Sequence, residues 1–451
     1  MKAIKPLLLT LFSIILLTSC QVTVATSKTL SNIETMTLSN GLIVVVVPNH
    51  RAPVVHHSLW YKVGSADSPY DQTGIAHFVE HLMYKGTQKF PADSYKKTIN
   101  KLGGVQNANT TWDRTAYYVT IAKEYLAQIM ELEADRMNNL TFPAEDLEKE
   151  RLVVLQERNQ RTEAMPEGRL MEATNATFFW HHPYGKPIIG FQKHIEQYTR
   201  ENVVNFYNQW YAPNNAILVI AGDITLAEIK PLVKKYYEPI SQKIIPAKIR
   251  SEEPPHSNTT AKVEIRDTQL KSMFFEKIYQ APNHRTAGTE KEIALTLLAQ
   301  ILGDETNGRL QKALVEQQKT AHSVTANYTG YMLDPYNFTI FAVPVNAFDF
   351  ISLEAAIEAE IQRLIANGIT DQELAFAKQE HLLQYRYQLD SIDNIANYVG
   401  ENMAHGYNLE EITNFTPTVE KISAAEINQL AKDVLGKPAS VISCSYPIIQ
   451  N

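Results

Sequence analysis

Residues 74–87 constrain the fold most, because they place two histidines and a glutamate at helical spacing. The three residues are His77, Glu80 and His81, in the pattern His-x-x-Glu-His. Side chains four positions apart leave the same face of a helix, so both imidazoles can bind one ion, with Glu80 beside them. A catalytic zinc site usually has three protein ligands, often imidazoles, and one position for water. The stretch predicts two of these ligands; the alternative is a helix with two incidental histidines.

The run from residue 144 to residue 158 contains the candidates for a third ligand. It has no glycine or proline, carries acidic residues in its first turn and repeats apolar residues at helical spacing, so we expect a helix. Glu150 and Glu157 are seven positions apart, almost two turns, and share one face of that helix. For either glutamate alone, a solvated acidic face is the ordinary interpretation.

Together these residues give the sequence a resemblance to the pitrilysin family of zinc metallopeptidases, whose signature is the inverted motif His-x-x-Glu-His. In that family a downstream glutamate completes the zinc site, at a spacing that Glu157 matches, 76 residues after His81. The resemblance implies one Zn²⁺ per chain, held by His77, His81 and Glu157, with Glu80 as the general base. Glu150 matches a family glutamate that supports the site without binding the metal. The implied function is a zinc metalloendopeptidase that hydrolyses peptides or unfolded polypeptides in a closed chamber.

Residues 102–118 resemble the family's edge strand beside the metal, where a substrate backbone is added as a further strand. Asn107 and Ala108 fall on the positions that contact substrate in the family. From the residues alone, Gly103-Gly104 followed by this run is an ordinary turn that enters a strand.

The length predicts two or three domains, because 451 residues exceed what one compact core usually organises. The proline-containing, polar region 239–260 is the expected linker between a metal-bearing domain, 32–238, and a second domain, 261–451. Both domains end in a helix, a proline turn and a strand. The resemblance implies an α+β fold of two homologous α/β-sandwich halves, each an antiparallel-rich sheet packed by helices, paired like a clam.

The second half departs from the family pattern. Single-chain members place an arginine and a tyrosine there, seven residues apart, to bind substrate and stabilise the oxyanion. Val315 and His322 stand at the matching positions. We therefore expect a heterodimer in which a similar chain supplies the missing pair; a homodimer is the runner-up. A non-catalytic scaffold or assembly subunit with the same fold is the alternative from a different functional class.

The first twenty residues indicate export. A short basic start, an apolar run from residue 6 to residue 17 and Leu17-Thr18-Ser19-Cys20 resemble a bacterial lipoprotein signal, with plain secretion as the alternative. We expect an acylated Cys20, a tether over 21–31 and a periplasmic protein, anchored in the outer membrane of a Gram-negative bacterium. Cys444 is the other cysteine, so no internal disulfide is expected. A net charge of -7 argues against nucleic-acid binding.

Overall fold

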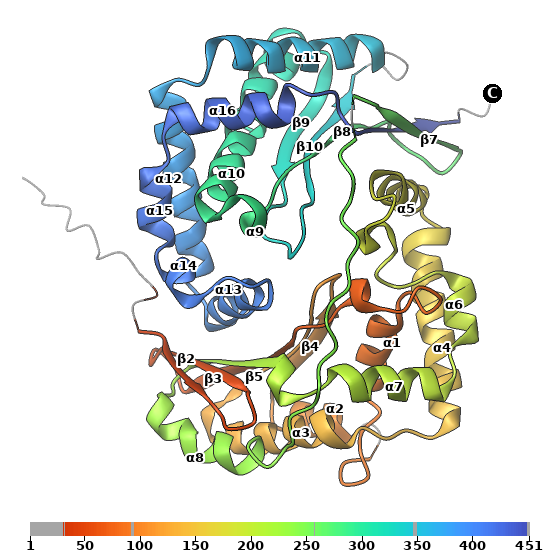
Figure 1. Cartoon of the computed structure of the whole chain (residues 1–451), viewed down its shortest axis with the longest axis vertical. Coiled ribbons are helices and arrows are strands. Elements are labelled where there is room, and N and C mark those ends of the chain that lie inside the picture. Colours follow the sequence, from red (N-terminus) through yellow and green to blue (C-terminus); the bar gives the residue numbers. More distant parts are fainter. Residues whose placement is uncertain (1–29, 31, 92–93, 257, 346–349, 449–451) are drawn as a thin grey trace, which may run out of the picture.

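Two α/β halves lie one above the other in the computed structural model, which describes residues 30, 32–91, 94–256, 258–345 and 350–448 (Figure 1). Each half contains one β-sheet with helices on its faces, and most strand pairs are antiparallel. The expected fold class is confirmed. The expected signal peptide, with Cys20, lies outside the described residues.

The first sheet has six strands in the order β1-β2-β6-β3-β5-β4. The pair β2 and β6 is parallel, and the other neighbours are antiparallel. Strand β4 is an edge, paired with β5 alone among the described strands. The strands are β1 (Glu34–Thr37), β2 (Ile43–Pro48), β3 (Val54–Tyr61), β4 (Val105–Thr110), β5 (Thr115–Ala122) and β6 (Ala216–Gly222).

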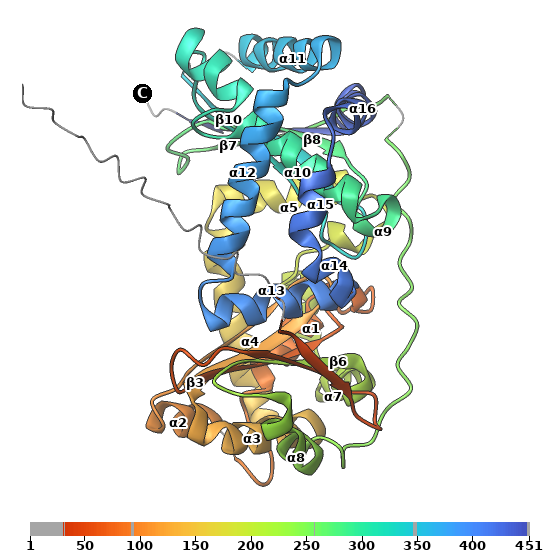
Figure 2. The same ribbon diagram turned by 90° about the vertical axis from the view of Figure 1, so that its left-hand side faces the viewer.

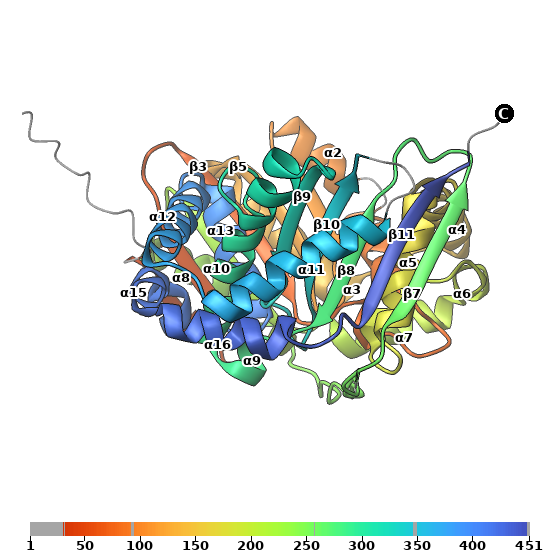
Figure 3. The same ribbon diagram turned by 90° about the horizontal axis from the view of Figure 1, so that it is seen from above.

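The second sheet repeats this order without a counterpart of β1: β7-β11-β8-β10-β9, visible from above in Figure 3. The pair β7 and β11 is parallel, as β2 and β6 are, and the other neighbours are antiparallel. The two halves therefore share one topology. The strands are β7 (Ala261–Asp267), β8 (Phe275–Gln280), β9 (Ala321–Tyr328), β10 (Asn337–Pro344) and β11 (Val441–Pro447).

Helices connect the strands in both halves. In the first half they are α1 (Ile75–Leu82), α2 (Ser94–Lys101), α3 (Leu126–Asn139), α4 (Ala144–Arg158), α5 (Pro166–Phe178), α6 (Gln192–Gln197), α7 (Arg200–Trp210) and α8 (Leu226–Tyr236). In the second half they are α9 (His284–Ala287), α10 (Thr289–Gly303), α11 (Phe350–Asn367), α12 (Asp371–Gln388), α13 (Ile392–Ala404), α14 (Leu409–Thr413), α15 (Phe415–Lys421) and α16 (Ala424–Leu435). Among the described residues, no helix combines the length and apolar composition that a bilayer span requires.

The apolar run of β2 is buried on both faces, as expected for a strand inside a covered sheet. Val44 and Val46 belong to the core formed with the first half's own helices. The alternate residues Val45 and Val47 belong to a different core, which includes Val399 of α13. Because successive side chains leave opposite faces, one strand contributes to both cores.

One helix from each half packs against the sheet of the other half. Helix α13 covers the inner face of the first sheet, and α5 covers the inner face of the second (Figures 1 and 2). Gly400 of α13 lies against Trp60, where a Cβ atom would be 2.2 Å from the indole ring. Thr174 of α5 is hydrogen-bonded to Ser443, with 3.0 Å between the hydroxyl oxygens. Neither sheet is covered by helices of its own half alone, so the halves depend on each other for burial.

A 3₁₀ turn, Lys123–Tyr125, leads into α3. The thiol of Cys444 is free and buried in the second core, where it packs as an apolar group.

A buried ionic cluster joins the halves where the chain passes between them. Arg250 contacts Asp67 at 3.1 Å and Asp334 at 2.8 Å, and it also pairs with Asp113. Asp67 and Asp113 belong to the first half and have fully or almost fully buried side chains, and Asp334 lies in the β9–β10 connection. The Arg250 side chain therefore neutralises carboxylates from both halves.

We expect Arg250→Met to lower the free energy of unfolding by about 3–5 kcal/mol, because removing one partner leaves buried carboxylates uncompensated. Urea denaturation of the purified chain measures this. The matched control is Arg266→Met on the exposed surface of β7, which should cost less than about 1 kcal/mol. Equal losses of unfolding free energy in the two variants would contradict the conclusion that Arg250 stabilises the contact between the halves.

Candidate metal centre

Helix α1 presents His77 and His81 on one face. It begins after Gly74, whose φ of 88° suits glycine, and a Cβ atom there would lie 2.3 Å from the Ile189 carbonyl oxygen. The two imidazole rings have centroids 4.7 Å apart. His77 is buried and His81 is partly exposed. The expected helical spacing is thus observed, and both rings border the same space.

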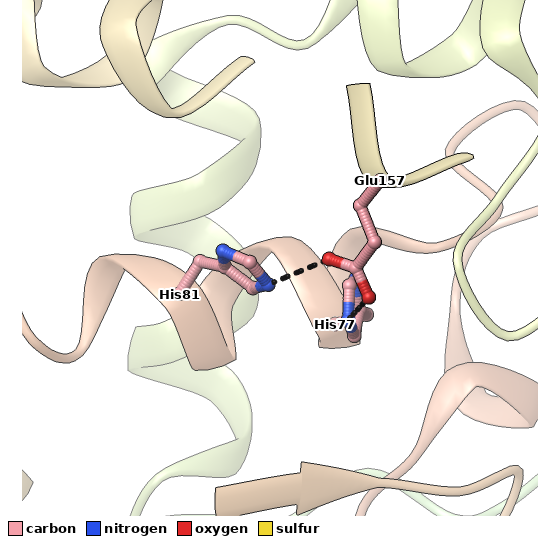
Figure 4. A group of neighbouring side chains, drawn as sticks. All are labelled: His77, His81 and Glu157. Carbon is pink, nitrogen blue, oxygen red and sulfur yellow. Dashed lines mark ion pairs between the residues drawn. The ribbon is translucent and has the colours of Figure 1, made fainter. Parts of the chain in front are cut away.

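Helix α4 brings two glutamates to these rings. Glu157 Oε2 lies 3.3 Å from His81 Nε2, and Glu157 Oε1 lies 3.7 Å from His77 Nε2 (Figure 4). One ligand atom from each of the three residues lies within 4.8 Å of the others. Glu157 is followed directly by Arg158 and a π-helical turn, Asn159–Glu163, a local form often found at functional sites.

Glu150 lies behind this group of three and fixes the orientation of one ring. Its Oε1 is 2.8 Å from His81 Nδ1, and its Oε2 is 2.5 Å from Lys85 Nζ. A histidine that donates its Nδ1 proton to a carboxylate keeps Nε2 available as a ligand atom. Glu150 therefore orients His81 toward Glu157, and Lys85 balances the Glu150 charge.

Electrostatics favour a positive ion in this group. Burial, then the neighbouring His81, lowers the pKa of His77 to about 4, so its ring is neutral. Burial opposes protonation of His81, but its hydrogen bonds with Glu150 and Glu157 raise its pKa to about 9. His81 is thus the imidazole of this group that carries an extra proton at neutral pH. A divalent metal would displace that proton.

The residues fit zinc by their chemistry. Two imidazole nitrogens and one carboxylate oxygen form a common catalytic zinc donor set. The remaining ring nitrogen of His77, Nδ1, is buried without a hydrogen-bond partner in the described part of the chain. Arg161 lies 2.8 Å from Glu157 Oε1 and is mostly exposed, so it can release that oxygen to a metal.

Glu80 lies on α1 between the two histidines in sequence, and its carboxylate is buried. The Thr110 hydroxyl donates a hydrogen bond of 2.5 Å to Glu80 Oε2. Burial raises the pKa of Glu80, and the Thr110 bond opposes the rise. Sequence reasoning missed Thr110. Its position two residues after Ala108, on the same face of an edge strand, was the signal that could have identified it.

Edge strand β4 runs beside this group. Asn107 is exposed and Ala108 is half-buried, and both line a cavity of about 780 Å³ together with the metal-site residues. The far wall comes from the second half, with Glu276, Ile278 and Tyr336. The cavity therefore spans both halves and borders a sheet edge to which a peptide strand can be added.

Val315 and His322 lie away from this cavity. Val315 is half-buried against the second core, in the π-helical segment Gln311–Gln317, and His322 is exposed on β9. Neither residue lines the cavity that contains the metal-site residues.

Comparison with known proteins assigns most of the chain to two domain types. Residues 43–191 match the model for insulinase, peptidase family M16, and residues 197–380 match the peptidase M16 inactive domain. A similar curated protein is the zinc protease PqqE of Helicobacter pylori, with 28% identity over 89% of this chain and 89% of that protein. All seven expected site residues lie in the first matched segment.

Solved structures share the fold. A crystal structure of a protease from Helicobacter pylori has a TM-score of 0.85 and 27% identity, and covers 92% of this chain and 99% of that one. The first half of the periplasmic protease PqqL from Escherichia coli has a TM-score of 0.79 at 20% identity, covering 93% of each chain. The chain therefore carries both domains of the M16 (insulinase/pitrilysin) peptidase family, and its homologues include zinc proteases.

Proposed function

We propose that this protein is a zinc metalloendopeptidase whose metal is held by His77, His81 and Glu157. The observation that carries the proposal is the convergence of these three side chains within 4.8 Å, from two helices far apart in sequence. Homologues named as zinc proteases support zinc at the level of the family. The metal, when bound, supplies a Lewis acid and an activated water.

The chain's own residues perform the proton transfers. Glu80 is the general base: its carboxylate is buried beside the histidines and held by Thr110. Its raised pKa suits a group that accepts a proton and then returns it to the leaving amine. Glu150 keeps His81 in the orientation required of a ligand, and Lys85 holds Glu150 in place.

The substrate is an extended peptide or unfolded polypeptide segment. Main-chain hydrogen bonds to the free edge of β4 would hold it at Asn107 and Ala108, with little demand on its sequence. The cavity of about 780 Å³ has room for several side chains but is too small for a folded domain.

We expect Glu80→Gln to lower peptide turnover by about a hundredfold to ten-thousandfold, because it removes the general base but no ligand. Zinc content, measured by elemental analysis, should stay at one per chain. The control is Glu148→Gln, which removes an exposed carboxylate from α4 and should change neither quantity. Unchanged turnover in Glu80→Gln would exclude its role as base. A wild-type chain that holds no zinc and cleaves no peptide would favour the non-catalytic scaffold.

We further propose that a similar chain completes the active enzyme. In single-chain members of the family, an arginine and a tyrosine of the second half bind substrate and stabilise the oxyanion. Val315 cannot donate a hydrogen bond, and His322 is exposed on β9. A heterodimeric partner that lacks the His-x-x-Glu-His motif would supply the missing pair; a homodimer is the runner-up.

Adding the partner should raise cleavage of a quenched peptide by at least about a hundredfold, which is the typical contribution of an oxyanion donor. The partner is first isolated by affinity capture from the native membrane, and rates are then compared for this chain alone, for the partner alone and for the mixture. Full activity of this chain alone, as a monomer, would contradict the proposal. Activity that follows dimerisation of this chain alone would establish the homodimer.

We also propose that the mature protein is periplasmic and anchored in the outer membrane by an acylated Cys20. The residue after Cys20 is Gln21, not aspartate, which by analogy with bacterial lipoprotein sorting favours the outer membrane.

Cys20→Ser should move the protein from the membrane fraction to the soluble fraction, because the acylated residue is lost. The control Cys444→Ser changes a thiol buried in the second core and should leave the distribution unchanged. A Cys20→Ser protein that fractionates like the wild type would contradict lipid anchoring.

A further inference from the structure

A second cavity, of about 740 Å³, is lined mainly by the second half, at the place that corresponds to the metal cavity of the first half. Thr111 and Arg114 of the first half complete its lining. Helix α10 follows β8 and precedes β9, as α1 follows β3 and precedes β4. Helices α10 and α13 line this cavity, as α1 and α5 line the metal cavity. The duplicated topology therefore forms two equivalent hollows, and only the first contains the metal-site residues.

Aromatic rings line this second-half cavity, which we define by Glu292, Tyr328, Tyr398 and Tyr407. Their positions are fixed by contacts outside the cavity. The Tyr407 ring stacks on His284 with centroids 3.8 Å apart. The Tyr328 hydroxyl donates a hydrogen bond to the Pro282 carbonyl oxygen. The Tyr398 ring lies edge-on to Tyr385, with centroids 5.4 Å apart. Each of the three rings is therefore held by a contact with the protein.

Glu292, on the first turns of α10, is the one carboxylate of this cavity without a strong partner in the described part of the chain. Its Oε1 accepts a hydrogen bond of 3.3 Å from Thr296, and it forms no ion pair there. The other two acids of the cavity are engaged: Glu401 pairs with Arg114, and Glu411 accepts hydrogen bonds from Thr289 and the Asn408 backbone.

Burial raises the pKa of Glu292 to about 7, and the Thr296 hydroxyl opposes the rise. Burial raises the pKa of Tyr328, Tyr398 and Tyr407, and the nearby Glu292 carboxyl adds to the rise in each. Glu292 and the three tyrosines line the same cavity, and a bound cation would favour the ionised form of Glu292. A cation bound among them would be attracted by both.

We propose that the second-half cavity binds the ammonium group of a small organic cation, with Glu292 as counter-ion and Tyr328, Tyr398 and Tyr407 as its aromatic walls. Aromatic rings around an acid recognise alkylated ammonium groups through cation–π attraction. A metal ion fits less well, because no group of three metal-ligating side chains was found in this cavity among the described residues. The site is separate from the proposed zinc centre and does not require it.

The test is calorimetric titration of the full chain with four probes. Choline supplies a quaternary ammonium, and its neutral isostere 3,3-dimethyl-1-butanol supplies the same shape without charge. Butylammonium and 1-butanol form the matching primary pair. We expect one or both cations to bind and both neutral alcohols to bind at least about tenfold more weakly.

Glu292→Gln keeps the shape of the side chain and removes its charge, so it should weaken cation binding by about tenfold or more. Glu290→Gln is the matched control, because it makes the same change on an exposed position of α10 and should leave binding unaltered. If Glu292→Gln does not fold, Tyr398→Leu replaces it, since it removes one aromatic wall and should also weaken binding.

The pattern of binding separates the outcomes. Preference for choline over butylammonium identifies a quaternary ligand, and the reverse preference identifies a primary amine. Equal binding of a cation and its neutral isostere, absence of binding by both cations, or unchanged affinity in the Glu292 and Tyr398 variants would each overturn the proposal.

Discussion

The structure depends on the burial of two inner sheet faces by helices that come from the opposite half. Val45 and Val47 of the first sheet would face water without α13, and Ile278 and Val441 of the second would face water without α5. Burying apolar surface is the main favourable term in folding, so this exchange holds the two halves in one arrangement. The cavity with the metal-site residues extends between them, and its far wall therefore has a defined position.

Within that frame, paired charges set the geometry of the candidate centre. Lys85 balances Glu150, Glu150 orients His81, and Arg161 contacts Glu157 from the outside. Each charged group at the centre has a partner of opposite sign, which offsets the cost of burial. Glu80 differs, because a hydroxyl is its hydrogen-bond partner. A buried carboxylate held in this way is suited to moving a proton.

Duplication of one topology gives two hollows with different chemistry. In the first, α1 and α4 contribute imidazoles and carboxylates that converge on one point. In the second, α10 contributes one carboxylate, Glu292, which has no ion-pair partner in the described part of the chain and lines the cavity together with tyrosine rings. The shared strand order explains why both hollows exist, and the side chains on equivalent helices determine what each can bind. The strand order therefore sets the fold of each half, and the side chains that line its hollow set what that hollow can bind.

The sequence by itself determined the local facts: the helical spacing of His77 and His81, the helix that carries Glu150 and Glu157, and the apolar strands of both sheets. These follow from periodicities of 3.6 and 2 along the chain, which neighbours in sequence define. Only the tertiary structure decided which residues meet across long separations. Thr110 reaches Glu80, Arg250 joins Asp113 to Asp334, and α5 and α13 exchange sheets, because those contacts depend on how packed layers are arranged in space.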